Sequence, residues 1–293
     1  MTLEQLRIFV DVAERLHVTR AAEHLHLTQS SVSAALAALE ARHGVKLFNR
    51  VGRGIELTQA GALFLPSARA VLEKAGDAAR LLKDLSGAPS GTLSIHASQT
   101  VASYFLPSRL MRYHEIHPQV DLAISVGNTR QAADAVLCGA SDLAVVEGRV
   151  DEPALLLTKV GEDRLVLVVG RRHRWAKGEG LMPSDLLDTD WIHREDGSGT
   201  RAALEEELSR LGIAPSALRV ALELPSNEAV IAAVAAGTSA AVLSFRAVEA
   251  HLAQGRLVMP DFPMPSRLFF LARHRERHVT RAMRAMVDLM GEG

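Results

Sequence analysis

The sequence has little of several features that would direct a protein to a particular compartment or partner. Its 293 residues carry 33 lysines and arginines against 34 acidic residues, so the net charge is only −1 and no overall field draws the chain to nucleic acid. Aromatic residues make up 4% of the chain. No apolar run reaches the length of a membrane span, and the N-terminus lacks the basic and apolar segments of an export signal. We therefore expect a cytoplasmic protein with no membrane partner.

Reactive and metal-binding side chains are equally sparse. Cys138 is the only cysteine, which excludes an internal disulfide, and we interpret it as a small packed residue near a helix end at Gly139. His114 and His117 lack a third ligand at metal-binding spacing. The chain also lacks the phosphate loop and the nucleophile elbow of common enzyme classes. We predict no cofactor, no metal site and no catalytic residue.

Residues 18–40 have the spacing of two short helices joined by a tight turn. Thr19 and Thr28 stand where a hydroxyl would cap each helix, and no acidic residue lies between His24 and Leu39. A small, polar, acid-free helix after a capped turn suits the DNA major groove, although any helical hairpin with a serine-rich solvated face would look the same. The predicted DNA contacts in this stretch are Thr28, Gln29, Ser30, Ser31 and Ser33.

A basic segment follows this helical pair and favours the DNA-binding interpretation. No acidic residue lies between Arg42 and Ile55, and short extended pieces flank a glycine-rich turn, which is the pattern of a β-wing. Arg50 and Arg53 are predicted to lie along the sugar-phosphate backbone, where they would add affinity but little sequence information.

A long helix is predicted over residues 59–86. Apolar residues recur there at alternating spacings of four and three from Gly61 to Leu82, which is a heptad seam. Packing of this stripe on its own domain is the alternative. We favour dimerisation, because a groove-reading helix gains from a symmetric partner on the next half-site.

The character of the sequence changes after the helix-breaking residues 87–91. Strand and helix patterns then alternate, which predicts parallel strands with right-handed crossovers in two small α/β lobes. The predicted units are a winged helix-turn-helix domain over 1–58, a linker helix over 59–86, a hinge over 87–91 and an effector domain over 92–293. Lobe I would span about 92–160 and 267–293, and lobe II about 161–266.

Polar loops precede several predicted helices of the two lobes. Ligands bind such sheets at the carboxyl ends of strands, where helix N-termini present free N–H groups; ordinary helix capping is the alternative for each loop taken singly. We predict that the loops converge on a cleft for a small anion such as a carboxylate or a sulfur oxyanion. The leading contacts are Ser98, Thr100, Thr129, Ser198 and Thr200, followed by Gln99, Asn128, Glu147 and Asn227.

The N-terminal motifs, in this order and at these spacings, resemble those of LysR-type transcriptional regulators. They are Leu3-Glu-Gln-Leu-Arg-Ile-Phe, Thr19-Arg-Ala-Ala-Glu-His-Leu, Thr28-Gln-Ser-Ser-Val-Ser and Gly44-Val-Lys-Leu-Phe-Asn-Arg. The resemblance implies a winged helix-turn-helix that binds promoter or operator DNA, a dimerising linker helix and a two-lobed effector domain like a periplasmic binding protein. It also implies a homotetramer as the common working form and leaves RNA polymerase open as a further partner.

One position departs from the family pattern. The family often has a long polar or basic residue after the serine that corresponds to Ser33, and this chain has Ala34. Gln29 and the serines would then carry most of the direct readout. The competing interpretations are an enzyme and a cytoplasmic small-molecule-binding protein without gene control.

Overall fold

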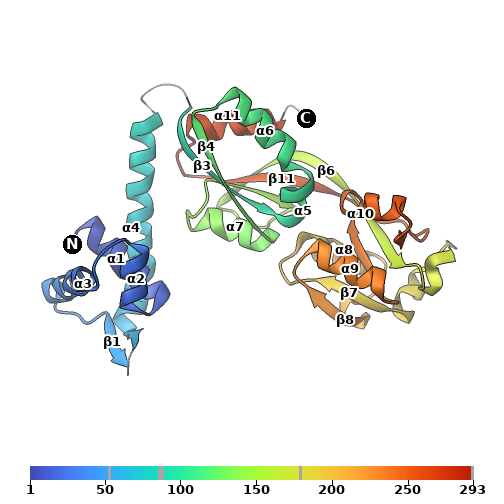
Figure 1. Cartoon of the computed structure of the whole chain (residues 1–293), viewed down its shortest axis with the longest axis horizontal. Coiled ribbons are helices and arrows are strands. Elements are labelled where there is room, and N and C mark those ends of the chain that lie inside the picture. Colours follow the sequence, from blue (N-terminus) through green and yellow to red (C-terminus); the bar gives the residue numbers. More distant parts are fainter. Residues whose placement is uncertain (52–53, 85–88, 178–179, 292–293) are drawn as a thin grey trace. The chain divides into compact units, whose positions relative to one another are not determined.

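The computed structural model describes residues 1–51, 54–84, 89–177 and 180–291 (Figure 1). The chain divides into two compact units, Met1–Ser86 and Gly87–Gly293, and each has its own hydrophobic core. Within the described ranges, no helix combines the length and apolar character needed to cross a membrane, and no group of three His, Cys, Asp or Glu side chains is placed to hold a metal ion.

The first unit packs α1 (Leu3–Arg15), α2 (Val18–His24) and α3 (Gln29–His43) around a common core. A capping box begins α1: the Thr2 hydroxyl accepts the N–H of Gln5 at 3.1 Å, and the Gln5 side chain accepts the N–H of Thr2 at 3.0 Å. The core side chains of these helices are Leu6, Ile8, Phe9, Val12, Ala21, Ala22, Val32, Leu36 and Leu39.

The two predicted caps of the helical pair have different outcomes. The cap of α3 is confirmed, since the Thr28 hydroxyl accepts the N–H of Ser31 at 3.2 Å. The cap at Thr19 is wrong, because α2 already begins at Val18. Its cap is His17, whose Nδ1 accepts the N–H of Arg20 at 3.4 Å, so an imidazole nitrogen takes the place of the predicted hydroxyl.

The predicted wing forms directly after α3. β1 (Phe48–Val51) and β2 (Gly54–Leu57) pair antiparallel, and α4 (Gln59–Asp84) follows, with the Thr58 hydroxyl accepting the N–H of Gly61 at 3.0 Å. A Cβ at Gly61 would collide with a backbone carbonyl oxygen of the core, so only glycine permits this close approach.

The two ends of the predicted heptad seam of α4 have different environments. Ala68 is fully buried, and Leu65 and Leu72 pack beside it against the core of the same unit. This part of the stripe packs on its own domain, because α1 and the wing cover it from the same chain. Leu82 is 70% exposed, so dimerisation stays a prediction for the C-terminal part of the helix.

The second unit is built on a sheet with strand order β4-β3-β5-β11-β6-β9-β7-β8. The strands of the first lobe, β3 (Gly91–Ser98), β4 (Val120–Gly127) and β5 (Leu143–Glu147), run parallel. In the second lobe β7 (Asp190–Arg194) runs parallel to both β8 (Arg219–Leu224) and β9 (Ala240–Ser244). The predicted alternation of strand and helix is therefore confirmed within each lobe.

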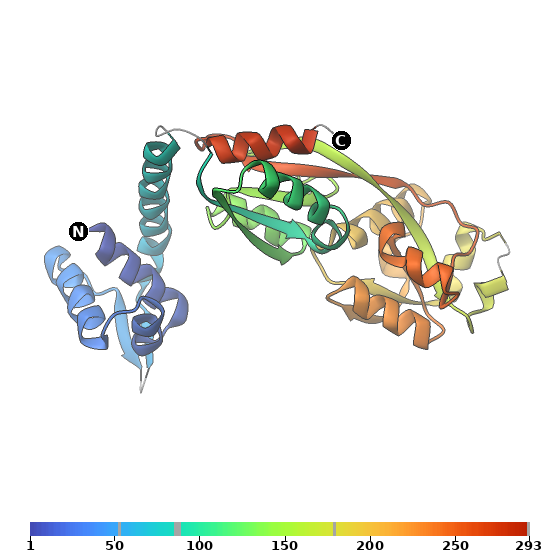
Figure 2. The ribbon, with the colours of Figure 1, turned by 45° about the horizontal axis from the view of Figure 1, so that its top comes forward.

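The lobes are joined by β6 (Leu155–Gly170) and β11 (Ser266–His274), which pair antiparallel and pass from one lobe into the other (Figure 2). β6 pairs with β9 at its far end, while β11 pairs with β5. A register shift between Phe269 and Phe270 leaves Val160 out of the ladder, which is a β-bulge in the ribbon.

Helices cover both faces of this sheet. In the first lobe these are α5 (Gln99–Tyr104), α6 (Leu106–Ile116), α7 (Thr129–Leu137) and α11 (Arg281–Gly291). In the second lobe they are α8 (Gly199–Arg210), α9 (Asn227–Ala236) and α10 (Phe245–Ala253). α6 and α11 share one core with β3 and β5, and α7 packs on the other face.

Several predicted elements of this unit need correction. The single helix expected from Val101 to His117 is interrupted at Phe105, because Pro107 near the start of α6 lacks an N–H and disfavours a continuous helix. β6 begins far earlier than the predicted strand, and β7 and α10 were not predicted. Cys138 is exposed, not packed, at the C-cap position that follows α7.

Candidate functional site

The predicted DNA-contacting side chains of α3 all lie on its solvent side. Val32, Leu36 and Leu39 are buried, so helical geometry directs the opposite face outward. Thr28, Gln29, Ser30, Ser31 and Ser33 are all exposed. The Thr28 hydroxyl lies 2.9 Å from that of Ser30 and 2.8 Å from that of Ser31, so these three form the helix cap and Gln29 is the longest polar side chain among the predicted contacts on this face.

Of the two predicted wing arginines, the structure places only the backbone of Arg50. Arg50 pairs with Ile55 in the β1–β2 ladder; its side chain, and Arg53 as a whole, lie outside the described residues. The basic segment is less free than its sequence implies, because Lys46 Nζ lies 2.6 Å from Glu40 Oε2.

Glu40 ties the end of α3 to the wing. Its Oε1 accepts the backbone N–H groups of Leu47 at 2.8 Å and of Phe48 at 3.3 Å. Burial alone would raise the pKa of Glu40, but the hydrogen bonds from Lys46 and these backbone groups hold it below its ordinary value. α3 and the wing are thus fixed to each other by a charged carboxylate.

In the second unit, polar groups from both lobes converge on Glu147, the last residue of β5, which is 3% exposed. Its Oε1 accepts the Ser98 hydroxyl at 3.0 Å and the Thr100 N–H at 3.2 Å. Its Oε2 accepts the Thr200 hydroxyl at 3.2 Å and a hydrogen bond from Arg267 Nη1. Each carboxylate oxygen therefore receives hydrogen bonds from two donors.

A second set of contacts joins α5 to α9 beside this carboxylate. The Asn227 side chain donates to the Thr100 hydroxyl at 3.0 Å, and its backbone N–H donates to Gln99 Oε1 at 2.7 Å. Arg194 Nη1 in turn donates to Asn227 Oδ1 at 2.6 Å. Sequence reasoning predicted the first three of these residues as effector contacts and missed Arg194.

The other predicted contacts serve backbone groups. Asn128 caps α7 with its side chain, and the Ser198 hydroxyl accepts the N–H of Thr200 at 3.3 Å. The Thr129 hydroxyl donates to the backbone carbonyl of Glu147 at 3.2 Å. Ordinary helix capping thus accounts for Ser198. Asn128 caps α7 and also donates from Nδ2 to the backbone carbonyl of Asp196 at 3.1 Å, while Thr129 fixes the end of β5.

Arg267 and Asp163, on the strands that join the lobes, were also missed. Arg267 Nε and Nη2 donate to Asp163 Oδ2 at 3.0 and 2.8 Å, and the Ser244 hydroxyl donates to Oδ1 at 2.8 Å. Burial alone would raise the pKa of Glu147, but the charge of Arg267 and the hydrogen bond from Thr100 hold it below its ordinary value. A charged residue beside an apolar strand run was the signal available in the sequence.

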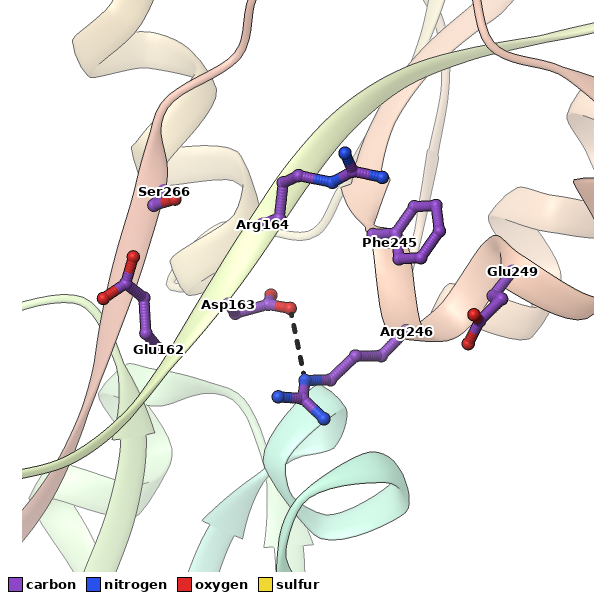
Figure 3. A pocket seen from close by; sticks show the side chains of 7 residues that line it. All are labelled: Glu162, Asp163, Arg164, Phe245, Arg246, Glu249 and Ser266. Carbon is purple, nitrogen blue, oxygen red and sulfur yellow. Dashed lines mark ion pairs between the residues drawn. The ribbon is translucent and has the colours of Figure 1, made fainter. Parts of the chain in front are cut away.

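Two cavities lie at the ends of this ion-pair chain. One, of about 480 Å³, lies between α7 and α8 and has Glu147 and Arg267 on its wall. The other, of about 440 Å³, is lined by Asp163 and Arg246 among others, and Figure 3 shows Arg246 reaching from α10 toward Asp163 on β6. Arg246 Nε lies 3.9 Å from Asp163 Oδ1.

Comparison with known families identifies both units. Residues 3–62 match the model of the bacterial regulatory helix-turn-helix protein, lysR family, and residues 86–293 match the LysR substrate binding domain. The chain belongs to the LysR family. This LysR-family chain is therefore a DNA-binding transcriptional regulator with an effector-binding domain, and not an enzyme.

Individual relatives and solved structures are similar to all or a large part of this regulator. The HTH-type transcriptional regulator YeiE of Escherichia coli K12 is 35% identical over 290 residues, which cover 98% of this chain and 96% of the relative. Full-length CbnR complexed with its target DNA has a TM-score of 0.71 at 22% identity and covers 100% of this chain and 99% of that one. The regulatory domain of Synechocystis PCC6803 CcmR in complex with 2-PG has a TM-score of 0.63 at 26% identity and covers 69% of this LysR-family chain and 97% of that one.

Proposed function

We propose that this regulator binds promoter or operator DNA in the cytoplasm and that a small oxyanion in the cleft around Glu147 modulates DNA binding or bending. The observation that carries the proposal is chemical. Ser98, Thr100, Thr200 and Arg267 direct hydrogen-bond donors from both lobes and a joining strand at a single carboxylate. Such a set of donors suits a negatively charged group of two or three oxygens.

For DNA recognition, we assign base-edge contacts to Gln29 and Ser33 and backbone contacts to the remaining predicted residues of α3 and the wing. An amide such as that of Gln29 can pair bidentately with adenine, and Ala34 can contact a thymine methyl group. With so few long side chains on α3, DNA shape would carry much of the remaining specificity.

A gel-shift titration against the DNA upstream of the protein's own gene tests this assignment. We expect nanomolar-range affinity that falls steeply with salt, because phosphate contacts release counterions. The absence of saturable, sequence-selective binding at low salt would contradict it.

For assembly, we propose a dimer through the exposed C-terminal part of α4 and a tetramer of two such dimers, within the predicted domain limits of 1–58, 59–86, 87–91 and 92–293. Residues 85–88, at the end of the predicted linker helix and the start of the predicted hinge, lie outside the described residues. We include RNA polymerase in the proposal only as a protein that the assembled regulator would contact while it is bound to DNA.

In this tetramer, a ligand that rotates one effector lobe against the other would change the spacing of the DNA-binding dimers. The energy available for this change is the difference in ligand affinity between the two states. A footprint length and a scattering profile that both stay constant at saturating ligand would exclude this mechanism.

The effector site is tested by a thermal-shift screen of small anions on the full chain, since a ligand that binds only the folded state raises the melting temperature. We expect Ser98→Ala and Thr200→Val, each of which removes a side-chain hydroxyl that donates to Glu147, to abolish the shift. Thr92→Val is the matched control, because Thr92 is exposed on β3 and lies six or more residues from either loop in the sequence. A shift that survives both cleft substitutions would place the ligand elsewhere.

A further inference from the structure

We infer that Glu147 is a resident ligand of the effector cleft, and that an effector oxyanion binds by displacing its carboxylate. The inference rests on the proposed function, because it concerns the same site. It goes further than the proposed function, because it states that the Glu147 carboxylate occupies the oxyanion position before the effector binds. The effector then has to compete with this carboxylate.

The hydrogen bonding of Glu147 carries this inference. Its Oε1 takes the Ser98 hydroxyl and the Thr100 N–H, and its Oε2 takes the Thr200 hydroxyl and Arg267. A carboxylate oxygen accepts about two hydrogen bonds well, so this carboxylate has little capacity left. The donors predicted to hold an anionic effector are thus already engaged by an anion of the protein itself.

Charge balance determines how an effector can enter. Arg267 lies between the Glu147 and Asp163 carboxylates and is 5% exposed. Removal of the Glu147 carboxylate alone would leave the buried Arg267 with one counter-ion in place of two and several donors unsatisfied, which is costly. An incoming oxyanion restores both the charge and the hydrogen bonds, so entry of the effector and exit of the side chain are coupled as an exchange.

The structure also provides a place for the displaced side chain. Glu147 lies on the wall of the cavity of about 480 Å³ between α7 and α8, and Arg130, Arg149 and Arg201 line the same cavity. Gly148 follows with a φ of +76°, a conformation that glycine adopts without strain. Rotation of the Glu147 side chain alone would bring its carboxylate toward this cavity. Acidic side chains line it as well, and two of the arginines already have carboxylate partners, Arg130 with Asp196 and Arg201 with Glu205 and Glu223.

The exchange has a regulatory consequence. In the resident state Glu147 links β5 of the first lobe to Thr200 on α8 of the second lobe. A free effector in the same position has no covalent bond to β5, so it replaces a tethered link between the lobes by an untethered one. Because the side chain is always present at high effective concentration, it lowers the apparent affinity for every effector that uses these donors.

The test compares the full-length wild-type chain with Glu147→Ala and Glu147→Gln. The probes are the sodium salts of formate, acetate, sulfate and sulfite, against sodium chloride at matched ionic strength. Thermal shift and calorimetric titration report binding. Glu206→Ala is the matched control, since Glu206 is an exposed acid that lines the same cavity and has no part in the donor set.

We expect at least one probe to bind Glu147→Ala on the order of tenfold or more tightly than wild type, because the competing carboxylate is gone. Glu206→Ala should bind like wild type. Glu147→Gln keeps the shape of the side chain and removes its charge, so it should gain affinity in the same direction if the alanine variant folds poorly. Addition of Thr200→Val to either variant should reduce the gain.

Two outcomes separate this inference from the proposed function. If wild type binds a probe, Thr200→Val removes that binding and both Glu147 variants bind it no more tightly than wild type, the resident-ligand inference is wrong and the effector cleft stands. If Thr200→Val leaves the binding of every probe unchanged in every background, the oxyanion site itself is wrong.

Discussion

The two units of the molecule use polar side chains in opposite ways. The recognition face of α3 presents Gln29 and Ser33 to solvent without buried charge, whereas the effector unit buries an ion-pair chain of Glu147, Arg267 and Asp163. A solvated face can bind a large polyanion through many weak contacts. A buried network fixes one arrangement and changes only when a group of matching charge replaces one of its members. The first is the surface that we propose to bind DNA, and the second is the site that we propose to bind the effector.

The largest expected effect is on the buried network. Arg267→Met leaves the carboxylates of Glu147 and Asp163 without their shared cation, which should destabilise the effector unit by about 3–5 kcal/mol. Denaturant unfolding of the full chain, with a probe on the second unit, measures this effect. Arg246→Met is the control: its side chain is 48% exposed and 3.9 Å from Asp163, so a loss above about 1 kcal/mol there would contradict the contrast.

The next largest effect is expected on DNA binding by the exposed face of α3. Gln29→Ala should reduce affinity for the specific operator by about 1–3 kcal/mol and relax specificity at one base position. It should leave thermal stability and non-specific binding nearly unchanged, because Gln29 is exposed. Gln254→Ala, an exposed glutamine of the effector unit, is the control in the same binding assay. Equal losses on specific and random DNA would assign Gln29 to the phosphate backbone.

A smaller effect concerns pH. The pKa of Glu147 is lowered in the folded chain from its ordinary value of 4.5. Its ionised form therefore stabilises the fold above about that pH, and this stability is lost as the pH falls through 4.5 toward the folded pKa. Melting temperatures of the wild type and of Glu147→Gln, measured from pH 7 down to about pH 3, should differ by a constant amount above pH 4.5 and converge below it. Parallel curves over this range would show that Glu147 does not contribute.

The smallest effect is expected at the outer edge of the cleft. Arg130 and Asp196 form an ion pair with Nη1 and Oδ2 2.6 Å apart, but their side chains are 63% and 69% exposed. Arg130→Ala should therefore leave the denaturant midpoint of the effector unit unchanged within experimental error. A measurable loss in the same denaturant experiment would indicate that charge at the surface, and not only in the buried network, holds the lobes together.

Local chemistry decided which parts of the fold the sequence could predict. The Thr2–Gln5 capping box, the Thr28 cap and the strand from Arg219 to Leu224 depend on neighbouring residues, and all are confirmed. β6 was recognised only in its second half, because Gly161 and the charged residues after it interrupt the apolar pattern of a strand that is paired on both sides.

In the effector site, too, the features that depend on neighbouring residues could be predicted, and those that depend on distant residues could not. Hydroxyl-bearing loops before helices could be predicted because their function as caps is local, and Thr100 and Thr200 do meet at one carboxylate. Arg267 could not be predicted, since it lies 120 positions from Glu147 in the sequence and its charge is buried only because β11 returns beside β5 and β6. That return belongs to the topology of the sheet, and no short motif encodes it.

The bulge at Val160 has a mechanical consequence. β6 and β11 cross between the lobes as a hydrogen-bonded ribbon, and the shift of register opposite Phe269 and Phe270 leaves one residue outside the ladder. Bulges raise local twist without separating the strands. We therefore expect the two lobes to rotate relative to each other through changes in the twist of this two-stranded ribbon near Val160. The rotation would be small and would need no flexible loop.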